Sequence, residues 1–118
     1  MSKGYLTTHV LDTYSGKPGS NIKGAVYRIN EGKKIKISDF SLNDEGRCSS
    51  PIVSSNDFVI GQYEIIFYCG EYFQSIENLK KPYFIDEVVI KFGVNNDAEH
   101  YHVPLLVTPW SYTTYKGS

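Results

Sequence analysis

Two histidines stand two residues apart in the stretch HYHVPLLVTP, near the C-terminal end of this 118-residue sequence. In an extended strand, His100 and His102 point to the same face, together with Pro104 and Leu106. The other face carries side chains suited to a hydrophobic core, namely Tyr101, Val103, Leu105 and Val107. A face that combines His, Pro and Leu suits neither solvent nor a core. We therefore expect it to be covered by another subunit or to line a site.

The stretch LTTHVLD near the start of the chain has the same two-sided character. His9 shares one face with Thr7 and Leu11, and the opposite face carries Leu6, Thr8 and Val10. Imidazole titrates near neutral pH, so a histidine turned away from the core can take up or release a proton in a reaction. A purely structural imidazole is the alternative for each histidine taken alone.

Metal and thiol chemistry are the next classes to consider. His100 and His102 could supply half of a metal site, but no carboxylate or cysteine is placed to complete the ligand set, so we expect no metal. Cys48 and Cys69 form no CxxC pair, and we expect free thiols in a reducing compartment. Cys48 follows Arg47, yet nothing around it in the sequence indicates an activated thiolate, so we expect it to be a bystander.

The composition excludes several classes of partner. Twelve Lys and Arg against 13 Asp and Glu leave a net charge of −1, which argues against nucleic-acid binding. No apolar run approaches the length of a membrane span, and the N-terminal stretch has no apolar segment typical of a secretory signal. We expect a single domain over residues 1–118, soluble and cytoplasmic, without nucleic-acid or membrane partners.

Turn signals divide the chain into short strand-like stretches. The segments YSGKPG, EGKK, NDEGR and NNDAEH are rich in Gly, Pro, Asn and Asp, the residues that favour β-turns. Between them, apolar and polar residues alternate with period two, for example Val88, Ile90, Phe92 and Val94. Seven short strands of this kind predict an all-β protein with a β-sandwich fold. One stretch, GEYFQSIENL, has apolar residues at helix-like spacing and predicts either a short helix or an irregular loop held by aromatic side chains.

Several blocks of the sequence together resemble one family. They are LTTHVLDTYSGKPG near the start, the GR of the NDEGR turn, GQYEIIF in the middle, and HYHVPLLVTPWSYTTYKGS at the end. In these blocks, in register over essentially the whole chain, the sequence is similar to the transthyretin-like 5-hydroxyisourate hydrolases. The resemblance implies a transthyretin-like β-sandwich of two antiparallel sheets with one short helix. It also implies a homotetramer, a dimer of dimers, with sites in a channel between the dimers.

The family reaction opens the ring of 5-hydroxyisourate, a product of urate oxidation, by hydrolysis without a metal or organic cofactor. The resemblance assigns catalytic roles to His9, Arg47, His102 and Ser118. It assigns substrate binding to His9, Arg47, Tyr115, Lys116 and Gly117. It implies no role for His100. Lys116 departs from the family's usual arginine, and lysine keeps the charge but loses the two-pronged guanidinium.

Two other functions are compatible with the same sequence. A transthyretin-like carrier would use the channel to bind a small aromatic ligand, as the ten tyrosines allow, although titratable groups in the channel disfavour a lipophilic hormone. An adhesion or accessory module of the β-sandwich class is the third possibility, and the missing secretory signal argues against it.

Overall fold

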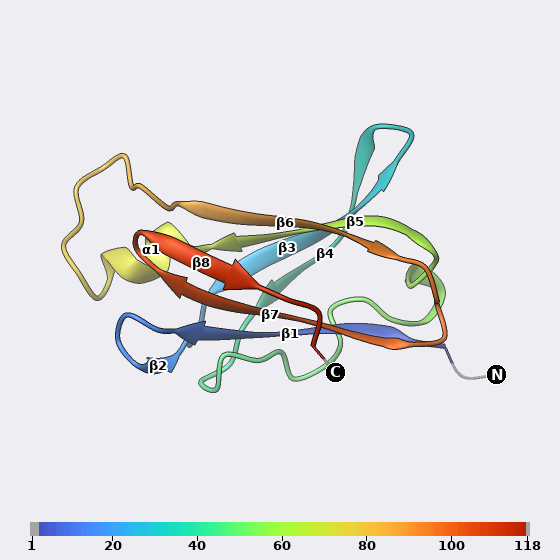
Figure 1. Cartoon of the computed structure of the whole chain (residues 1–118), viewed down its shortest axis with the longest axis horizontal. Helices are drawn as coiled ribbons and strands as arrows, with labels where there is room; N and C mark the ends of the chain where they lie inside the picture. The colour runs from blue at the N-terminus through green and yellow to red at the C-terminus, as the bar shows by residue number, and fades with distance from the viewer. Residues whose placement is uncertain (1–2, 118) are drawn as a thin grey trace.

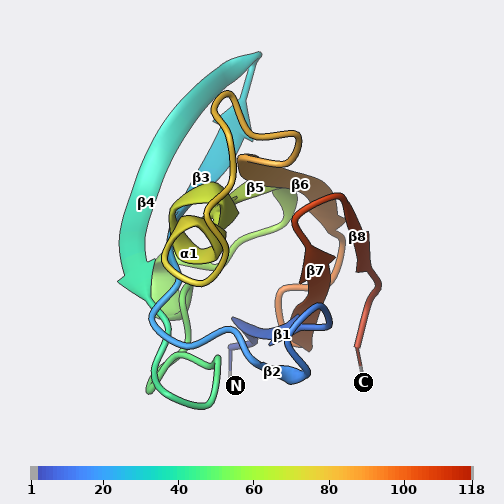
Figure 2. The ribbon, with the colours of Figure 1, turned by 90° about the vertical axis from the view of Figure 1, so that its left-hand side faces the viewer.

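The computed structural model describes residues 3–117, which form two four-stranded sheets around one hydrophobic core (Figures 1 and 2). The first sheet has the order β2-β1-β7-β8, with β1 at Tyr5–Asp12, β2 at Lys17–Pro18, β7 at His100–Thr108 and β8 at Ser111–Thr114. The second sheet has the order β4-β3-β5-β6, with β3 at Lys23–Asn30, β4 at Lys33–Ser41, β5 at Gly61–Tyr68 and β6 at Glu87–Val94. The predicted two-sheet sandwich with one short helix is confirmed.

Alternation along the strands decides which side chains fill the space between the sheets. The inward face of β7 consists of the four residues expected from the sequence, all buried: Tyr101, Val103, Leu105 and Val107. The expected face of β6 is also inward, with Val88, Ile90 and Val94 buried and Phe92 packed against the core. A fully buried Val or Leu contributes roughly 1.5–3 kcal/mol relative to an exposed one. A one-residue slip of either strand would expose the whole set, so burial fixes which face of β7 points outward.

One pair of neighbouring strands is parallel rather than antiparallel. β1 and β7 run parallel, with Thr7 opposite His102 and His9 opposite Pro104. Strands joined by tight turns, such as β3 and β4, are antiparallel, but no hairpin connects the first strand to the seventh. The parallel register places the outward residues of β1 directly beside the outward residues of β7.

Two further segments differ in detail from the sequence expectation. The predicted turn YSGKPG contains β2, a two-residue strand that pairs with the end of β1 and brings the number of strands to eight among the described residues. Of the two possibilities for GEYFQSIENL, a short helix or an irregular loop, the helix is present as α1 (Cys69–Gln74), and it is shorter than the apolar spacing suggested. Ser75 ends it by donating its hydroxyl proton to the carbonyl of Tyr72 at 2.6 Å. Within residues 3–117, no helix is long and apolar enough to cross a membrane.

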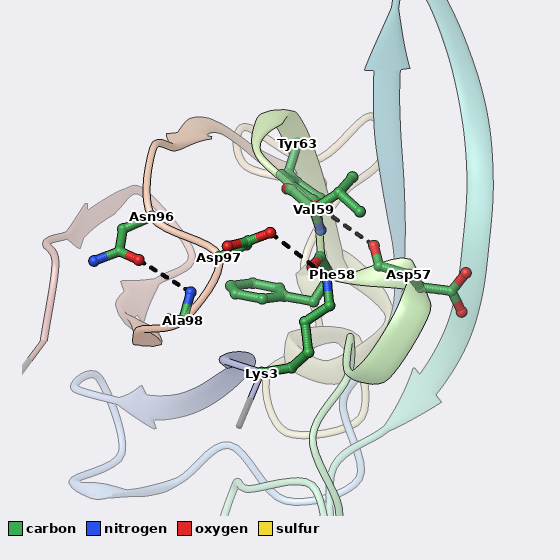
Figure 3. A network of polar contacts seen from close by, with 8 residues as sticks. All are labelled: Lys3, Asp57, Phe58, Val59, Tyr63, Asn96, Asp97 and Ala98. Carbon is green, nitrogen blue, oxygen red and sulfur yellow. Dashed lines mark hydrogen bonds and ion pairs between the residues drawn. The ribbon is translucent and has the colours of Figure 1, made fainter. Parts of the chain in front are cut away.

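Polar contacts at one end of the sandwich hold three loops together (Figure 3). The Tyr63 hydroxyl accepts a hydrogen bond from the Val59 amide at 2.9 Å and lies 2.7 Å from the Val59 carbonyl, beyond the 3-10 helix η1 (Ser55–Asp57). The Lys3 ammonium donates to the Phe58 carbonyl at 3.2 Å and lies 3.5 Å from the Asp97 carboxylate. The Lys3 contacts link the start of β1 to the loop before β5 and to the turn before β7.

Candidate functional site

The outward faces of β1 and β7 form the floor of the candidate site. Because the two strands are parallel and in register, the Thr7 side chain lies between the two outward histidines of β7. Its hydroxyl oxygen is 2.7 Å from Nε2 of His100 and 2.8 Å from Nδ1 of His102. The ring of Tyr5 stacks on the ring of His100, with the centroids 4.2 Å apart and the planes 15° from parallel. One threonine hydroxyl therefore joins two imidazoles.

The NDEGR turn brings Arg47 to the edge of this face. Inside the turn, the Asn43 side-chain oxygen accepts hydrogen bonds from the backbone N–H groups of Glu45 and Arg47 at 2.9 and 3.1 Å. The turn docks on β1 because the Val10 amide donates to the Gly46 carbonyl at 2.9 Å. This docking makes His9 and Arg47 β-bridge partners.

Only glycine fits the docked turn at position 46. Gly46 has a φ of +74°, in the left-handed region that side chains disfavour. A Cβ atom built on it would lie 2.4 Å from the carbonyl oxygen of Val10, which is backbone and cannot move aside cheaply. The GR dipeptide thus contains the glycine that allows the turn to dock on β1 and the arginine that this docking places at the site.

His9 is held by the same turn. Its Nε2 lies 3.0 Å from the Glu45 carbonyl oxygen, which can only accept, so Nε2 carries a proton and donates it. Burial and, next, the positive charge of Arg47 lower the pKa of His9 from its ordinary value of 6.5, against smaller opposing effects of Glu45. His9 is therefore mostly neutral at pH 7, with Nδ1 as its unprotonated nitrogen.

His102 is held on two sides. Nδ1 contacts Thr7, and the backbone amide of Gly117 donates to the His102 carbonyl at 2.7 Å. A Cβ atom at Gly117 would lie 2.6 Å from Cδ2 of the ring, so glycine is required for the C-terminal segment to pass this close. Burial lowers the pKa of His102, and the charges of His100, Arg47 and His9 lower it further.

A cavity of about 320 Å³ opens on this face. Seven residues line it: Tyr5, Thr7, Thr8, Arg47, Cys48, His100 and His102. The thiol of Cys48 is half-buried, and burial raises its pKa to about 11. Since the thiolate is the reactive form, this cysteine is not an activated nucleophile. Both cysteines, Cys48 and Cys69, lie in the described part of the chain and are free, as expected.

The predicted site residues do not all meet in this cavity. Arg47 and His102 line it, whereas His9 and Gly117 lie beside it as the β-bridge partners of Arg47 and His102. Tyr115 and Lys116 line a different cavity of about 230 Å³, on the core side of β7. Ser118 lies outside the described residues, so its predicted role stays a prediction.

The Lys116 side chain contacts other residues of the same chain. Its ammonium donates to the Glu99 carboxylate at 2.7 Å and lies 4.9 Å from the centre of the Tyr101 ring. This hydrogen bond to the Glu99 carboxylate raises the pKa of Lys116. The predicted contacts of Tyr115 and Lys116 with substrate stay predictions.

Sequence reasoning missed two residues of the site. Alternation alone placed Thr7 on the face of His9, but only the register of β1 against β7 shows that its hydroxyl meets His100 and His102. The stacking of Tyr5 on His100 depends on the same register. Across residues 3–117, no group of three His, Cys, Asp or Glu side chains is arranged to hold a metal ion. The expectation of a metal-free site stays a prediction.

Two four-stranded sheets, with histidines and an arginine gathered on the outer face of one of them, define a transthyretin-like sandwich with a polar site of the kind that enzymes use. This chain belongs to the HIUase/Transthyretin family, which matches residues 6–117.

Curated relatives resemble this chain over nearly its whole length. A 5-hydroxyisourate hydrolase from Pseudomonas aeruginosa is 44% identical over 98% of this chain and 92% of its own length. The 5-hydroxyisourate hydrolase 2 of Rhizobium meliloti is 42% identical, and the two chains cover each other completely.

Solved structures agree on the fold. A crystal structure of (S)-allantoin synthase superposes with a TM-score of 0.92 at 40% identity over 99% of this chain, which spans only 44% of that longer protein. The structure of a 5-hydroxyisourate hydrolase from Klebsiella pneumoniae superposes with a TM-score of 0.80 at 25% identity, over the full length of both chains.

Proposed function

We propose that this protein is a 5-hydroxyisourate hydrolase. It opens the ring of 5-hydroxyisourate to 2-oxo-4-hydroxy-4-carboxy-5-ureidoimidazoline in the degradation of urate. The observation that carries the proposal is the convergence of His9, Arg47 and His102 on one outer face, in a chain whose curated relatives are 5-hydroxyisourate hydrolases. The fold alone would not support it, since one fold hosts many functions.

The chemistry requires a base for water and an acid for the leaving nitrogen. In the proposed reaction, water adds to the ring carbonyl while a neutral imidazole takes its proton. The carbon–nitrogen bond then breaks, and the ring nitrogen receives a proton as it leaves. His9 and His102 divide these tasks, and the lowered pKa of each keeps an unprotonated ring nitrogen present at neutral pH.

Arg47 supplies positive charge to the reaction. Its guanidinium is exposed at the rim of the cavity and carries a positive charge, so it stabilises the oxyanion that forms when water adds. We assign Ser118 a supporting role through its hydroxyl or the terminal carboxylate. We assign Tyr115, Lys116 and Gly117 to substrate binding, as the family resemblance implies.

We further propose that the active form is a homotetramer, a dimer of dimers. Large apolar side chains remain exposed on the sheet that carries the site, among them Leu11, Trp110, Tyr112 and Tyr115. Covering them would exclude water from the cavity and bring a second C-terminal segment to it. Sedimentation equilibrium gives the mass directly, and a monomer at micromolar concentration would contradict this assembly. We place the enzyme in the cytoplasm, where free thiols such as Cys48 persist, and cell fractionation tests this.

The decisive assay generates 5-hydroxyisourate from urate with urate oxidase and follows its ultraviolet decay with and without this protein. We expect a marked acceleration over spontaneous decay. His9→Ala and His102→Ala each lower kcat about 100-fold or more, the loss typical of an acid–base group.

Gln62→Ala is the matched control, because Gln62 is exposed on β5 in the other sheet. Decay at the spontaneous rate with wild-type protein would refute the proposed function. Tight binding of a thyroxine-like aromatic ligand without hydrolysis would instead indicate a carrier.

A further inference from the structure

The Thr7 hydroxyl makes contacts that the proposed roles of His9, Arg47 and His102 do not explain. It lies within hydrogen-bonding distance of a nitrogen on each of two imidazoles, His100 at 2.7 Å and His102 at 2.8 Å. His100 has no assigned role, yet its ring is held flat against Tyr5. A ring that only faced solvent would not need this support.

The hydroxyl has one proton to donate, which limits the protonation of its two neighbours. It can donate to His100 or to His102, but not to both. At least one of the two facing nitrogens must therefore carry its own proton and donate to Thr7. Whenever Thr7 donates to one ring, the other ring must donate to Thr7, and in that arrangement the hydroxyl links the tautomer of one ring to the protonation of the other.

Each choice gives His102 a different chemistry at the cavity. When Thr7 donates to Nε2 of His100, Nδ1 of His102 must carry the proton, and neutral His102 then has its lone pair on Nε2. When Thr7 donates to Nδ1 of His102, the proton of the neutral ring lies on Nε2. The first form accepts a proton from water, whereas the second can only donate.

Gly117 lies beside the Cδ2 edge of the His102 ring. The backbone of Gly117 passes so close to Cδ2 that even a methyl group there would lie 2.6 Å from it. Nδ1 faces the hydroxyl, which leaves Nε2 and Cε1 for a substrate. Contacts on both edges of the ring thus fix its orientation.

We propose that Thr7 is a positioning residue for His102. Its hydroxyl holds His102 in the tautomer with a proton on Nδ1 while His100 accepts at Nε2, and it switches His102 to the other tautomer when His100 is protonated. The proposal deepens the proposed hydrolase function and rests on it for its catalytic consequence, but the hydrogen-bond linkage itself exists without substrate.

The charged groups around His102 act in the same direction. They are His100 on the same strand, His9 on β1 and Arg47 on the docked turn, and each lowers the pKa of His102. Protonation of His100 therefore makes a second proton on His102 less favourable, so His102 stays neutral with a single proton while His100 titrates. Under the proposal, the hydrogen bond with Thr7 decides whether that proton lies on Nδ1 or Nε2.

The test compares Thr7→Val, which removes the hydroxyl but keeps the shape, with Thr7→Ser, which keeps the hydroxyl. Thr13→Val is the matched control, because Thr13 is an exposed threonine just beyond β1 whose hydroxyl bonds only the Val107 carbonyl among the described residues. The chain has three histidines, so long-range 1H–15N spectra of the imidazoles contain three ring systems, assigned by single substitutions. The readouts are the His102 tautomer across a pH titration of the free protein, and kcat and KM.

In the wild type and in Thr7→Ser, we expect neutral His102 to carry its proton on Nδ1 and to change tautomer as His100 titrates. In Thr7→Val this coupling disappears, and kcat falls about 10-fold with KM nearly unchanged, because the base is lost rather than substrate binding. Thr13→Val keeps the wild-type spectrum and rate. His100→Phe keeps a ring for Tyr5 to stack on and removes the nitrogen, so it abolishes the titration-linked tautomer change even if Thr7→Val fails to fold.

A wild-type His102 that carries its proton on Nε2 throughout the titration would overturn the proposal. So would a Thr7→Val protein with an unchanged His102 tautomer and the kcat of Thr13→Val. Because the spectra need no substrate, an inactive wild type with the predicted tautomer coupling would refute the hydrolase function and leave the Thr7 linkage standing.

Discussion

Replacement of Gly46 by alanine tests how Arg47 reaches the site. Two separate penalties apply at this position. The residue has a φ of +74°, where an L-residue is less stable by about 1–2 kcal/mol. In addition, the new Cβ would lie 2.4 Å from the Val10 carbonyl oxygen, so the turn must move away from β1. That movement breaks the 2.9 Å hydrogen bond from the Val10 amide to the Gly46 carbonyl.

A matched substitution separates the two penalties. Gly32, at the tip of the β3–β4 hairpin, has a φ of +78° and no atom within 4 Å of its added Cβ. Gly32→Ala therefore costs only the backbone conformation, about 1–2 kcal/mol of unfolding free energy. Gly46→Ala costs that amount plus about 1–3 kcal/mol for the buried amide that loses its partner.

Urea denaturation measures the stability difference, and the decay of 5-hydroxyisourate measures the consequence for the site. We expect Gly46→Ala to be less stable than Gly32→Ala and to lose most of its activity, because Arg47 moves with the turn. Gly32→Ala should keep the wild-type kcat. Equal stability of the two variants together with full activity of Gly46→Ala would refute the claim that the docked turn positions Arg47.

Three further changes test other parts of the structure. Tyr72→Phe removes a 2.7 Å hydrogen bond to the buried Asp12 carboxylate, and urea denaturation should show a loss of about 1.5–3 kcal/mol, whereas no change would indicate that water replaces the hydroxyl. Lys116→Ala breaks an exposed ion pair and should cost less than about 1 kcal/mol by thermal melting, so a rise in its KM would report a substrate contact. The lowered pKa values of His9 and His102 mean that the unfolded chain binds more protons below pH 6.5. Stability and kcat should therefore both fall as the pH drops from 6.5 through the lower folded pKa values, and urea midpoints and rates measured over this range check it.

The fold was largely predictable because burial leaves a period-two signal along each strand. The alternation in HYHVPLLVTP correctly separated the core residue Leu105 from His102, and the same signal on LTTHVLD turned His9 outward. The helix was harder to delimit. Ile76 continues the apolar spacing of α1 but lies beyond its end and is exposed, so periodicity there reflects neither helix nor core.

The arrangement of the site was not predictable from alternation, because it depends on contacts between distant segments. Nothing in the sequence reveals that β1 lies parallel to β7, and a shift of two residues would keep every face while moving Thr7 away from His102. The glycine of NDEGR signals a turn, but not that this turn docks on Val10. Asp12 illustrates the reverse case: it belongs to a block shared with hydrolases, yet its buried carboxylate caps a turn and holds Tyr72 rather than facing the cavity.

The electrostatics of the site favour the neutral forms of His9 and His102. Arg47 and, in their protonated forms, His100 and His9 each lower the pKa of His102 through their positive charge. Positive charge favours neutral imidazoles, and neutral imidazoles are the form that accepts protons. Arg47 therefore has two effects in the proposed reaction, since the charge that stabilises an oxyanion also favours the neutral form of both histidines. A carboxylate in place of one of these neighbours would raise the histidine pKa values and oppose the developing oxyanion, so both requirements of the reaction favour the same cationic cluster.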